Sequence, residues 1–410
     1  HVAEPITGTE NPFAAGNHLV LDTQAENTGE VRWSLDVPAA GEYGVYVGYV
    51  ADPGRASDAH YVVRHVAGET HFRVDQRRRG STWVFLGSFY FTAGLDPDRG
   101  SVALLVDSAD PGSTISADVV RIGGGLSPFD RGGGQSGRPM YEHAARYYTQ
   151  WAGAPQSVWG YLGEGDDNDR SGDVGCRSRF AAWDHEDGED AVYVAWHTNA
   201  PSPGRGTSAY AYADVASGTL DDFSGVPGSL ELMDAIHSQL LADIRGEWDP
   251  DWTDRGQRTA FFGEVNPNHN PEMPATLLEV AFHDTAEDAA SLRDPRFRRL
   301  AARAIARGVA RYFADRDGQP VVLPPEPPST LKMTSDGDEH LLVSWSPVEG
   351  ADGYVVYLSP DGLGFGEGIE VDDNQLRIDR GGRFPMQFAR VAARNAGGES
   401  LPSRVVGARV

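Results

Sequence analysis

The stretch VYVAWHTNAP, Val192 to Pro201, sets the character of the central part of the chain. Residues 192–196 are a short apolar run of β-formers, which is typical of a buried strand in a parallel sheet. The run ends on His197, and two glycines follow closely. Ligands of open α/β sheets bind outside the carboxyl ends of the strands. His197 therefore stands where a functional side chain is expected.

The segments around this strand alternate between helix and strand patterns. SLELMDAIHSQLLADIRG (229–246) places its large apolar residues on one helical face, and ATLLEVAFH (275–283) is a second buried strand. Asp294 is predicted to cap a long helix with Pro295 in its first turn. This alternation predicts an α/β domain, a mostly parallel sheet flanked by helices.

Both flanking segments carry β-strand patterns. GEYGVYVGYV (41–50) alternates strictly, and Gly, Pro and Asp clusters separate such runs, which predicts an antiparallel β-sandwich. Trp345 and Tyr354 are predicted core residues of the C-terminal segment. The predicted organisation is a β-sandwich over 1–124, a Gly-rich linker over 125–138, an α/β domain over 139–318, a Pro-rich linker over 319–328 and a β-sandwich over 329–410.

Composition narrows the possible partners. The chain has 410 residues, 40% of them hydrophobic, and a formal net charge of −25. This charge disfavours nucleic acid and anionic membrane surfaces as partners, because phosphate would repel it. The single cysteine, Cys176, excludes an internal disulfide and a cysteine-based zinc cluster. No apolar run is long enough to predict a membrane span.

Glu279 is the second candidate for chemistry, because a carboxylate inside a buried strand is costly unless it is paired. Neutral imidazole is the commonest zinc ligand, and a nearby carboxylate can act as general base for a metal-bound water. Each residue also has a structural interpretation, His197 as a hydrogen-bonding strand end and Glu279 as an ion-pair partner. A glycosidase pair of Glu279 and Glu264 is not favoured by the spacing. No Gly-x-Ser-x-Gly elbow occurs in the α/β segment.

The segment from Pro139 to Asp317 resembles the zinc-dependent N-acetylmuramoyl-L-alanine amidases of the type-3 family. The resemblance lies in RSRFAAWDHEDGEDAVYVAWHTNAP (177–201), MPATLLEVAFHDTAEDAASLRDP (273–295) and the helix end GVARYF (308–313). It implies a Zn²⁺ cofactor, His197 as a metal ligand, Glu279 as the catalytic residue, and Asn199 and Arg177 as substrate-binding residues. The implied reaction is hydrolysis of the amide between the lactyl group of muramic acid and L-alanine in peptidoglycan.

The flanking segments resemble modules that accompany wall enzymes. Residues 12–124 are similar to golvesin-type carbohydrate-binding-like modules through AGEYGVYVGY and TWVFLGSFYFTAG, and the C-terminal part resembles a fibronectin type III domain through VSWSPVEGADGYVVY. These resemblances imply glycan or protein contacts through the β-domains. They also imply a secreted, periplasmic or cell-envelope location in a bacterium.

One departure from the family concerns the zinc ligands. The family takes them from a Gly-His-Gly turn, a glutamate on the next helix and the strand histidine, and this chain has no Gly-His-Gly. We expect the first strand and helix of the amidase domain to precede His1, with the β-module inserted after them. His269 and His283 are the candidates for replacement ligands.

Other titratable residues of this segment are predicted away from the site, and two other functions are alternatives to the amidase. His185 and Glu186 are predicted at the far end of the strand, and His237 in or beside the core. The alternative functions are a non-catalytic wall-binding scaffold with a degenerate amidase fold, and a zinc peptidase or deacetylase acting on a related wall substrate.

Overall fold

The computed structural model describes residues 17–80, 82–123, 138, 143–160, 169–186, 188–380 and 386–409. The predicted Gly-rich linker therefore lies outside the described residues except for Arg138. The chain divides into two compact units, one formed by the central α/β segment and the other by the two β segments. None of the described helices is long and apolar enough to cross a membrane.

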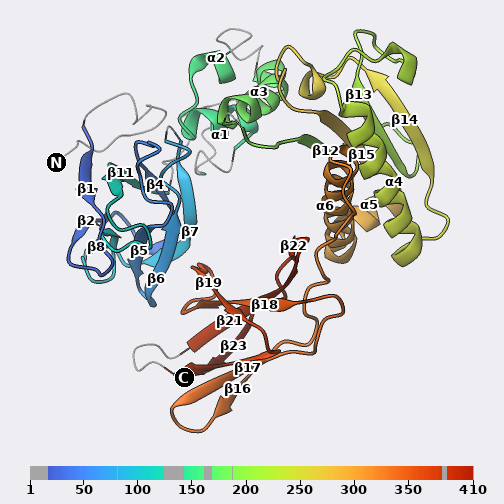
Figure 1. Ribbon diagram of the computed structural model, residues 1–410. Coiled ribbons are helices and arrows are strands. Elements are labelled where there is room, and N and C mark those ends of the chain that lie inside the picture. Colours follow the sequence, from blue (N-terminus) through green and yellow to red (C-terminus); the bar gives the residue numbers. More distant parts are fainter. Residues whose placement is uncertain are drawn as a thin grey trace. The chain divides into compact units, whose positions relative to one another are not determined.

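The N-terminal segment is a β-sandwich with strands paired antiparallel (blue to cyan in Figure 1). Its two larger sheets have the orders β2-β9-β5-β6 and β11-β4-β7. Alternate side chains of both sheets, such as Val63 and Phe89, fill one core. The strands are β1 Leu19–Asp22, β2 Glu30–Ser34, β3 Asp36–Val37, β4 Gly41–Gly48, β5 Ala59–His65, β6 Gly68–Val74, β7 Val84–Phe91, β8 Gly94–Leu95, β9 Ser101–Leu105, β10 Thr114–Ala117 and β11 Val119–Ile122.

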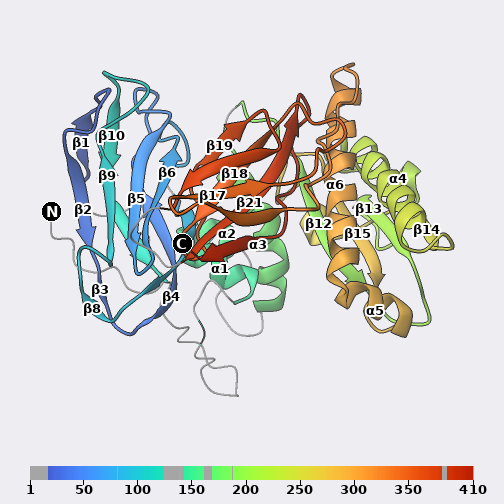
Figure 2. The ribbon, with the colours of Figure 1, turned by 90° about the horizontal axis from the view of Figure 1, so that it is seen from below.

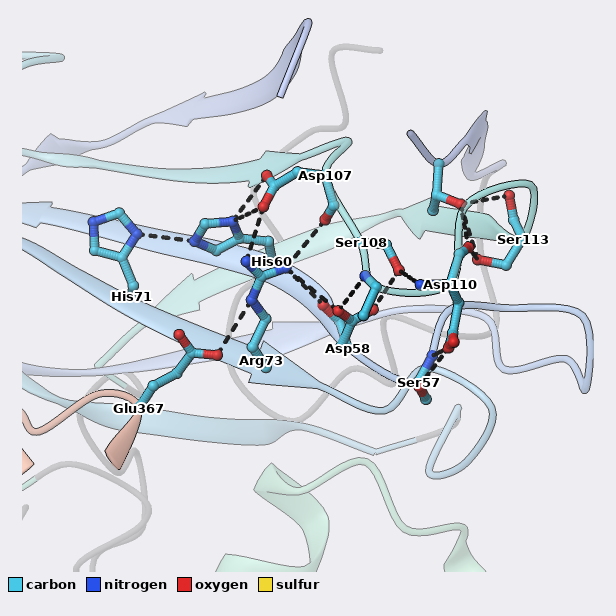
Figure 3. Close-up of polar contacts among 12 residues, drawn as sticks. Ser57, Asp58, His60, His71, Arg73, Asp107, Ser108, Asp110, Ser113 and Glu367 are labelled. Atoms are coloured by element: carbon cyan, nitrogen blue, oxygen red, sulfur yellow. Dashed lines mark hydrogen bonds and ion pairs between the residues drawn. The ribbon is translucent and has the colours of Figure 1, made fainter. Parts of the chain in front are cut away.

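A chain of polar contacts crosses the β5–β6 pair of this sandwich (Figure 3). His60 Nδ1 lies 2.7 Å from a carboxylate oxygen of Asp107, and His60 Nε2 lies 2.9 Å from Nδ1 of His71. Arg73 donates to the same Asp107 carboxylate at 2.8 Å. Burial lowers the pKa of His71, and the neighbouring His60 lowers it further.

This arrangement predicts that acid weakens the N-terminal sandwich. Because the pKa of His71 is lower in the folded chain than its ordinary 6.5, the unfolded chain binds the proton more readily. The contribution of His71 to stability is therefore complete above that value and is lost as the pH falls below it. Amide hydrogen exchange of β5 and β6 should show opening becoming easier between about pH 7.5 and 5.5. His71→Gln should reduce this dependence, and an unchanged dependence would contradict the assignment.

The central segment holds a four-stranded sheet in the order β12-β15-β13-β14. β12 runs parallel to β15 and β13 parallel to β14, but β13 is antiparallel to β15, so the predicted mostly parallel sheet is a mixed one. The elements are α1 Ala145–Trp151, α2 Gln156–Trp159, α3 Asp169–Asp184, β12 Tyr193–Asn199, β13 Thr207–Tyr212, η4 Leu220–Asp222, α4 Ser229–Glu247, β14 Asp254–Ala260, η5 Gly263–Val265, β15 Ala275–Phe282, α5 Ala286–Arg293 and α6 Pro295–Arg316.

Helices α4 and α6 cover one face of this sheet (Figures 1 and 2). The predicted stripe of α4, Met233, Ile236, Leu240 and Ile244, is fully buried there. Asp294 caps α6 by accepting a hydrogen bond from the backbone N–H of Arg296 at 2.8 Å, with Pro295 in the first turn as predicted. These two helices therefore form the packed back of the sheet.

The C-terminal segment is also formed by two antiparallel sheets, β16-β17-β20 and β19-β18-β21-β22 with β23 beside β21. Trp345 and Tyr354 lie in its core with ring centroids 5.1 Å apart, as predicted. The strands are β16 Lys332–Asp336, β17 His340–Ser344, β18 Gly353–Ser359, β19 Gly368–Val371, β20 Gln375–Asp379, β21 Met386–Asn395, β22 Gly398–Glu399 and β23 Val406–Arg409. Residues 319–328, the predicted Pro-rich linker, contain no helix or strand.

Candidate active site

His197 and Glu279 are direct neighbours on the two parallel strands β12 and β15. Side chains alternate between the two faces of a strand. Val194 and Leu278 point to the α4–α6 face, whereas Ala195 and Leu277 join a smaller apolar cluster on the opposite face. His197 and Glu279 follow Ala195 and Leu277 by two residues each. Both therefore lie on the face opposite the α4–α6 layer.

The short helix η5 covers this face and brings Glu264 to His197. Val265 of η5 packs into the same cluster as Ala195 and Leu277. The side chain of Glu264 is only 3% exposed, and its carboxylate pairs with Nε2 of His197. The hydrogen bond that His197 donates to the Glu264 carboxylate raises the pKa of His197 above its ordinary value.

Arg177 holds the other oxygen of the Glu264 carboxylate. Its guanidinium donates to Glu264 at 2.7 Å and to Asp173, one turn earlier on α3, at 2.6 Å. The four side chains form a continuous series of polar contacts, Asp173–Arg177–Glu264–His197, of which the first two are ion pairs. In this structure Arg177 supports the buried carboxylate, and its role in substrate binding stays a prediction.

Glu279 has one buried oxygen without a partner among the described residues, Oε2. Burial raises the pKa of Glu279 above its ordinary value, although His197 and His283 lower it in part. Ser208 on β13 is the neighbour of Glu279 on the other side, and its buried Oγ also has no partner within the described part. His197, Glu279 and Ser208 thus form a row across three adjacent strands, with two polar atoms able to accept or donate further hydrogen bonds.

The strand ends beyond this row are fixed by close contacts. Asn199 turns its amide oxygen back to the N–H of Ala200 at 2.8 Å. Gly206 has φ +91°, and a Cβ there would lie 1.9 Å from the carbonyl oxygen of Thr253. The fully buried Asp288 accepts hydrogen bonds from the N–H groups of Gly206 and Phe282. A glycine is therefore required at position 206, and substrate binding by Asn199 stays a prediction.

The remaining histidines have local structural partners. His269 Nδ1 donates to the carbonyl of Gly263 at 2.7 Å and so anchors η5, and His283 follows the end of β15 beside Thr198. His185 pairs with Glu272 beyond the end of α3, and the buried His237 lies near Asp254. The placement of His185 before the strand and of His237 in the core agrees with the sequence analysis.

In the described part of the chain, the donor side chains around His197 do not make up a zinc site. Over the described ranges no three His, Cys, Asp or Glu side chains come together as a group that could hold a metal ion. Three protein ligands are the usual minimum for catalytic zinc. The described residues therefore do not fit a zinc ion by themselves, and neither His269 nor His283 completes a site with His197.

Comparison with known proteins agrees with this organisation. Residues 165–311 match the family model described as N-acetylmuramoyl-L-alanine amidase, and residues 7–124 match the Golvesin C-terminal domain. The chain thus combines a segment similar to N-acetylmuramoyl-L-alanine amidases with a segment similar to the Golvesin C-terminal domain. The matched range of the amidase domain includes the row of His197, Glu279 and Ser208 together with Glu264.

Relatives of the chain are matched over part of their length. The sporulation-specific N-acetylmuramoyl-L-alanine amidase of Bacillus subtilis (strain 168) is 31% identical over 30% of this chain and 40% of its own. The xanthan lyase of Bacillus sp. (strain GL1) is 32% identical over 28% of this chain and 12% of its own. The catalytic domain of the amidase CwlV from Bacillus (Paenibacillus) polymyxa var. colistinus is 27% identical, with a TM-score of 0.23, over 30% of this chain and 57% of that one. The chain thus spans less than half of the two curated relatives.

Three residues of the site were not predicted from the sequence. The sequence offers Glu264 only as a glycosidase acid, and it gives no prediction for Asp173 or Ser208. Their signal is weak because Glu264 is 67 residues from His197 and reaches it through a loop. A short GEV segment between two strand patterns carries no periodicity that would place it on the sheet.

The stability of the Ser208→Ala variant tests whether the buried hydroxyl of Ser208 lacks a hydrogen-bond partner. Removing a buried hydroxyl that has no partner should raise the free energy of unfolding by about 1 kcal/mol. The neighbouring Thr207 is the control, because its Oγ1 donates to Val280 at 2.7 Å and accepts from Trp252 at 2.9 Å. Thr207→Val should lower the same quantity by about 1–3 kcal/mol in urea unfolding. A loss in Ser208→Ala would show that a water or another group satisfies the hydroxyl in solution.

Proposed function

We propose that the chain hydrolyses the amide between N-acetylmuramic acid and L-alanine in peptidoglycan. One observation carries the proposal: His197 and Glu279 lie side by side on one face of the sheet, inside the range that matches the amidase family. The family match supports peptidoglycan amidase activity, and the choice of bond follows the family description.

Glu279 is the proposed proton acceptor. Its carboxylate is half-buried, and burial raises its pKa toward the range in which a general base is effective. Its Oε2 has no partner among the described residues, so no hydrogen bond to those residues competes with a proton for the carboxylate. Ser208 on the adjacent strand offers a second hydrogen-bonding atom. His197, held by Glu264, completes the polar side of the site.

The cofactor, the β-domains and the location extend the same proposal. In this proposal His197 is one zinc ligand, and the further ligands come from outside the described residues. The golvesin-type module and a fibronectin type III-like C-terminal domain would contact glycan or protein in the wall. A secreted or cell-envelope location in a bacterium follows from the substrate.

The test is digestion of purified peptidoglycan by the full chain. Release of L-alanine amino termini and of stem peptides without the muramic lactyl group, read by mass spectrometry, is the expected result. Cleavage inside the stem peptide would instead indicate a peptidase, and loss of acetyl groups a deacetylase. Intact peptidoglycan with a folded, metal-supplemented chain would contradict the proposal.

A wall-binding scaffold is the second candidate, and one observation favours it. The described residues do not assemble three metal-binding side chains. A scaffold should sediment with insoluble peptidoglycan without cleaving it and without bound zinc. Stoichiometric zinc together with cleavage would exclude it.

A further inference from the structure

Glu264 is an ionised carboxylate inside the amidase domain. Its Oε1 accepts a hydrogen bond at 2.7 Å from the guanidinium of Arg177, which stays charged in proteins, so Glu264 is the charged partner of an ion pair. Arg177 is itself fixed by Asp173, and η5 is fixed by the bond from His269 to the carbonyl of Gly263. The carboxylate therefore has a defined charge and a defined position.

The charge of Glu264 decides which nitrogen of His197 carries a hydrogen. An ionised carboxylate can only accept hydrogen bonds, so Nε2 of His197 must be the donor. In the neutral imidazole the lone pair then lies on Nδ1. Nδ1 makes no hydrogen bond with any residue that the structure describes, and the side chain of His197 is 32% exposed.

We propose that Glu264 is the positioning residue of His197, fixing Nε2 as its bonded nitrogen and leaving Nδ1 for the reaction. This inference rests on the proposed function. A carboxylate behind a functional histidine orients the ring and selects its tautomer, and losing such a partner usually costs 10- to 100-fold (order of magnitude) in activity or affinity. Arg177 and Asp173 keep the charge of Glu264 balanced in its buried position.

The experiment compares Glu264→Gln and Glu264→Ala with a matched control, Glu272→Gln. Glu272 pairs with His185 at 2.8 Å in the same unit, away from the row. On peptidoglycan, Glu264→Gln should lower kcat by about 10- to 100-fold with KM changed less than about twofold. Glu272→Gln should match the wild type.

A second readout is independent of hydrolysis. In metal-free chain labelled with ¹⁵N-histidine, the Nε2–H resonance of His197 should be protected from exchange in wild type and in Glu272→Gln. The resonance should broaden or disappear in Glu264→Ala.

Each outcome bears on the inference. Wild-type kcat in Glu264→Gln, or an unchanged His197 resonance in Glu264→Ala, would overturn it. If Glu264→Ala unfolds, the near-isosteric glutamine variant decides. A purely structural role would lower the unfolding midpoint while kcat per folded molecule stayed constant, and this would also overturn the inference. If the wild type does not cleave peptidoglycan but the resonances change as expected, the proposed function fails while the positioning of His197 stands.

Discussion

Glu279→Gln is expected to lower the rate of peptidoglycan hydrolysis by about 10²- to 10⁴-fold, the usual contribution of a general base. The substitution keeps the size of the side chain and removes its ability to accept a proton. Because the N–H groups and hydrogen bonds of β15 are unchanged, folding should be retained. Product release per unit of folded chain, followed by mass spectrometry, measures the effect.

The dependence of kcat/KM on pH tests whether the loss of activity in Glu279→Gln is the loss of a base. Burial raises the pKa of Glu279 above the ordinary 4.5, so wild-type kcat/KM should begin to fall at a pH above that value as the base becomes protonated. This acidic limb should be missing from the residual activity of Glu279→Gln. Glu231→Gln, at an exposed position of α4, should keep both the rate and the limb. Equal activity of wild type and Glu279→Gln would remove Glu279 from the mechanism.

Gly206→Ala is expected to destabilise the central unit by about 3 kcal/mol, combining a left-handed backbone conformation with overpacking. At φ +91° an alanine is strained, and its Cβ would lie 1.9 Å from the carbonyl oxygen of Thr253. The chain cannot move away easily, because the N–H of Gly206 is bound to the buried Asp288 at 2.9 Å. Urea unfolding of the full chain, followed by the Trp248 and Trp252 fluorescence of this unit, measures the loss.

The substitution Gly246→Ala in the same unit is expected to have the opposite effect on the free energy of unfolding. Gly246 lies inside α4, and a Cβ there would meet nothing within 4 Å. Gly246→Ala should therefore raise the free energy of unfolding by about 0.5–1 kcal/mol, because alanine is the better helix former. If both substitutions had the same effect, the close approach of Gly206 to Thr253 would not exist in solution.

The sequence predicts the elements with strong periodicity. The buried strand 275–282 and the apolar stripe of α4 are confirmed, because side-chain period and burial agree in them. A strand over 193–199 is also confirmed, but its predicted burial is wrong: β12 lies at the edge of the sheet, only Ala195 is buried in it, and Trp196 is exposed. The cap of α6 is confirmed because Asp294 and Pro295 act within a single turn. Such features depend on neighbours along the chain, and they are therefore visible in the sequence.

Features that depend on distant neighbours were not predictable. The direction of β13 relative to β15 is decided by how the chain returns after Gly206, and TSAYAY carries no signal for it. PMYEHAARYYTQWAG (139–153) carries a helical pattern, but the helix α1 begins at Ala145, and residues 139–142 lie outside the described residues. Glu264 reaches His197 only because η5 packs on the sheet beside Ala195 and Leu277. The strand patterns therefore identified the neighbouring residues His197 and Glu279 but not the carboxylate that binds His197.

The central place of β15, between a parallel and an antiparallel partner, limits how this domain can change in length. Deleting one residue from β15 upstream of Glu279 would rotate the glutamate into the α4–α6 layer, while removing two would restore its direction. Insertions in the connecting loops do not change the face on which a strand residue lies, whether their number is odd or even. Differences in domain length should therefore accumulate in the loops, and β15 should tolerate insertions or deletions only of two residues at a time, if at all.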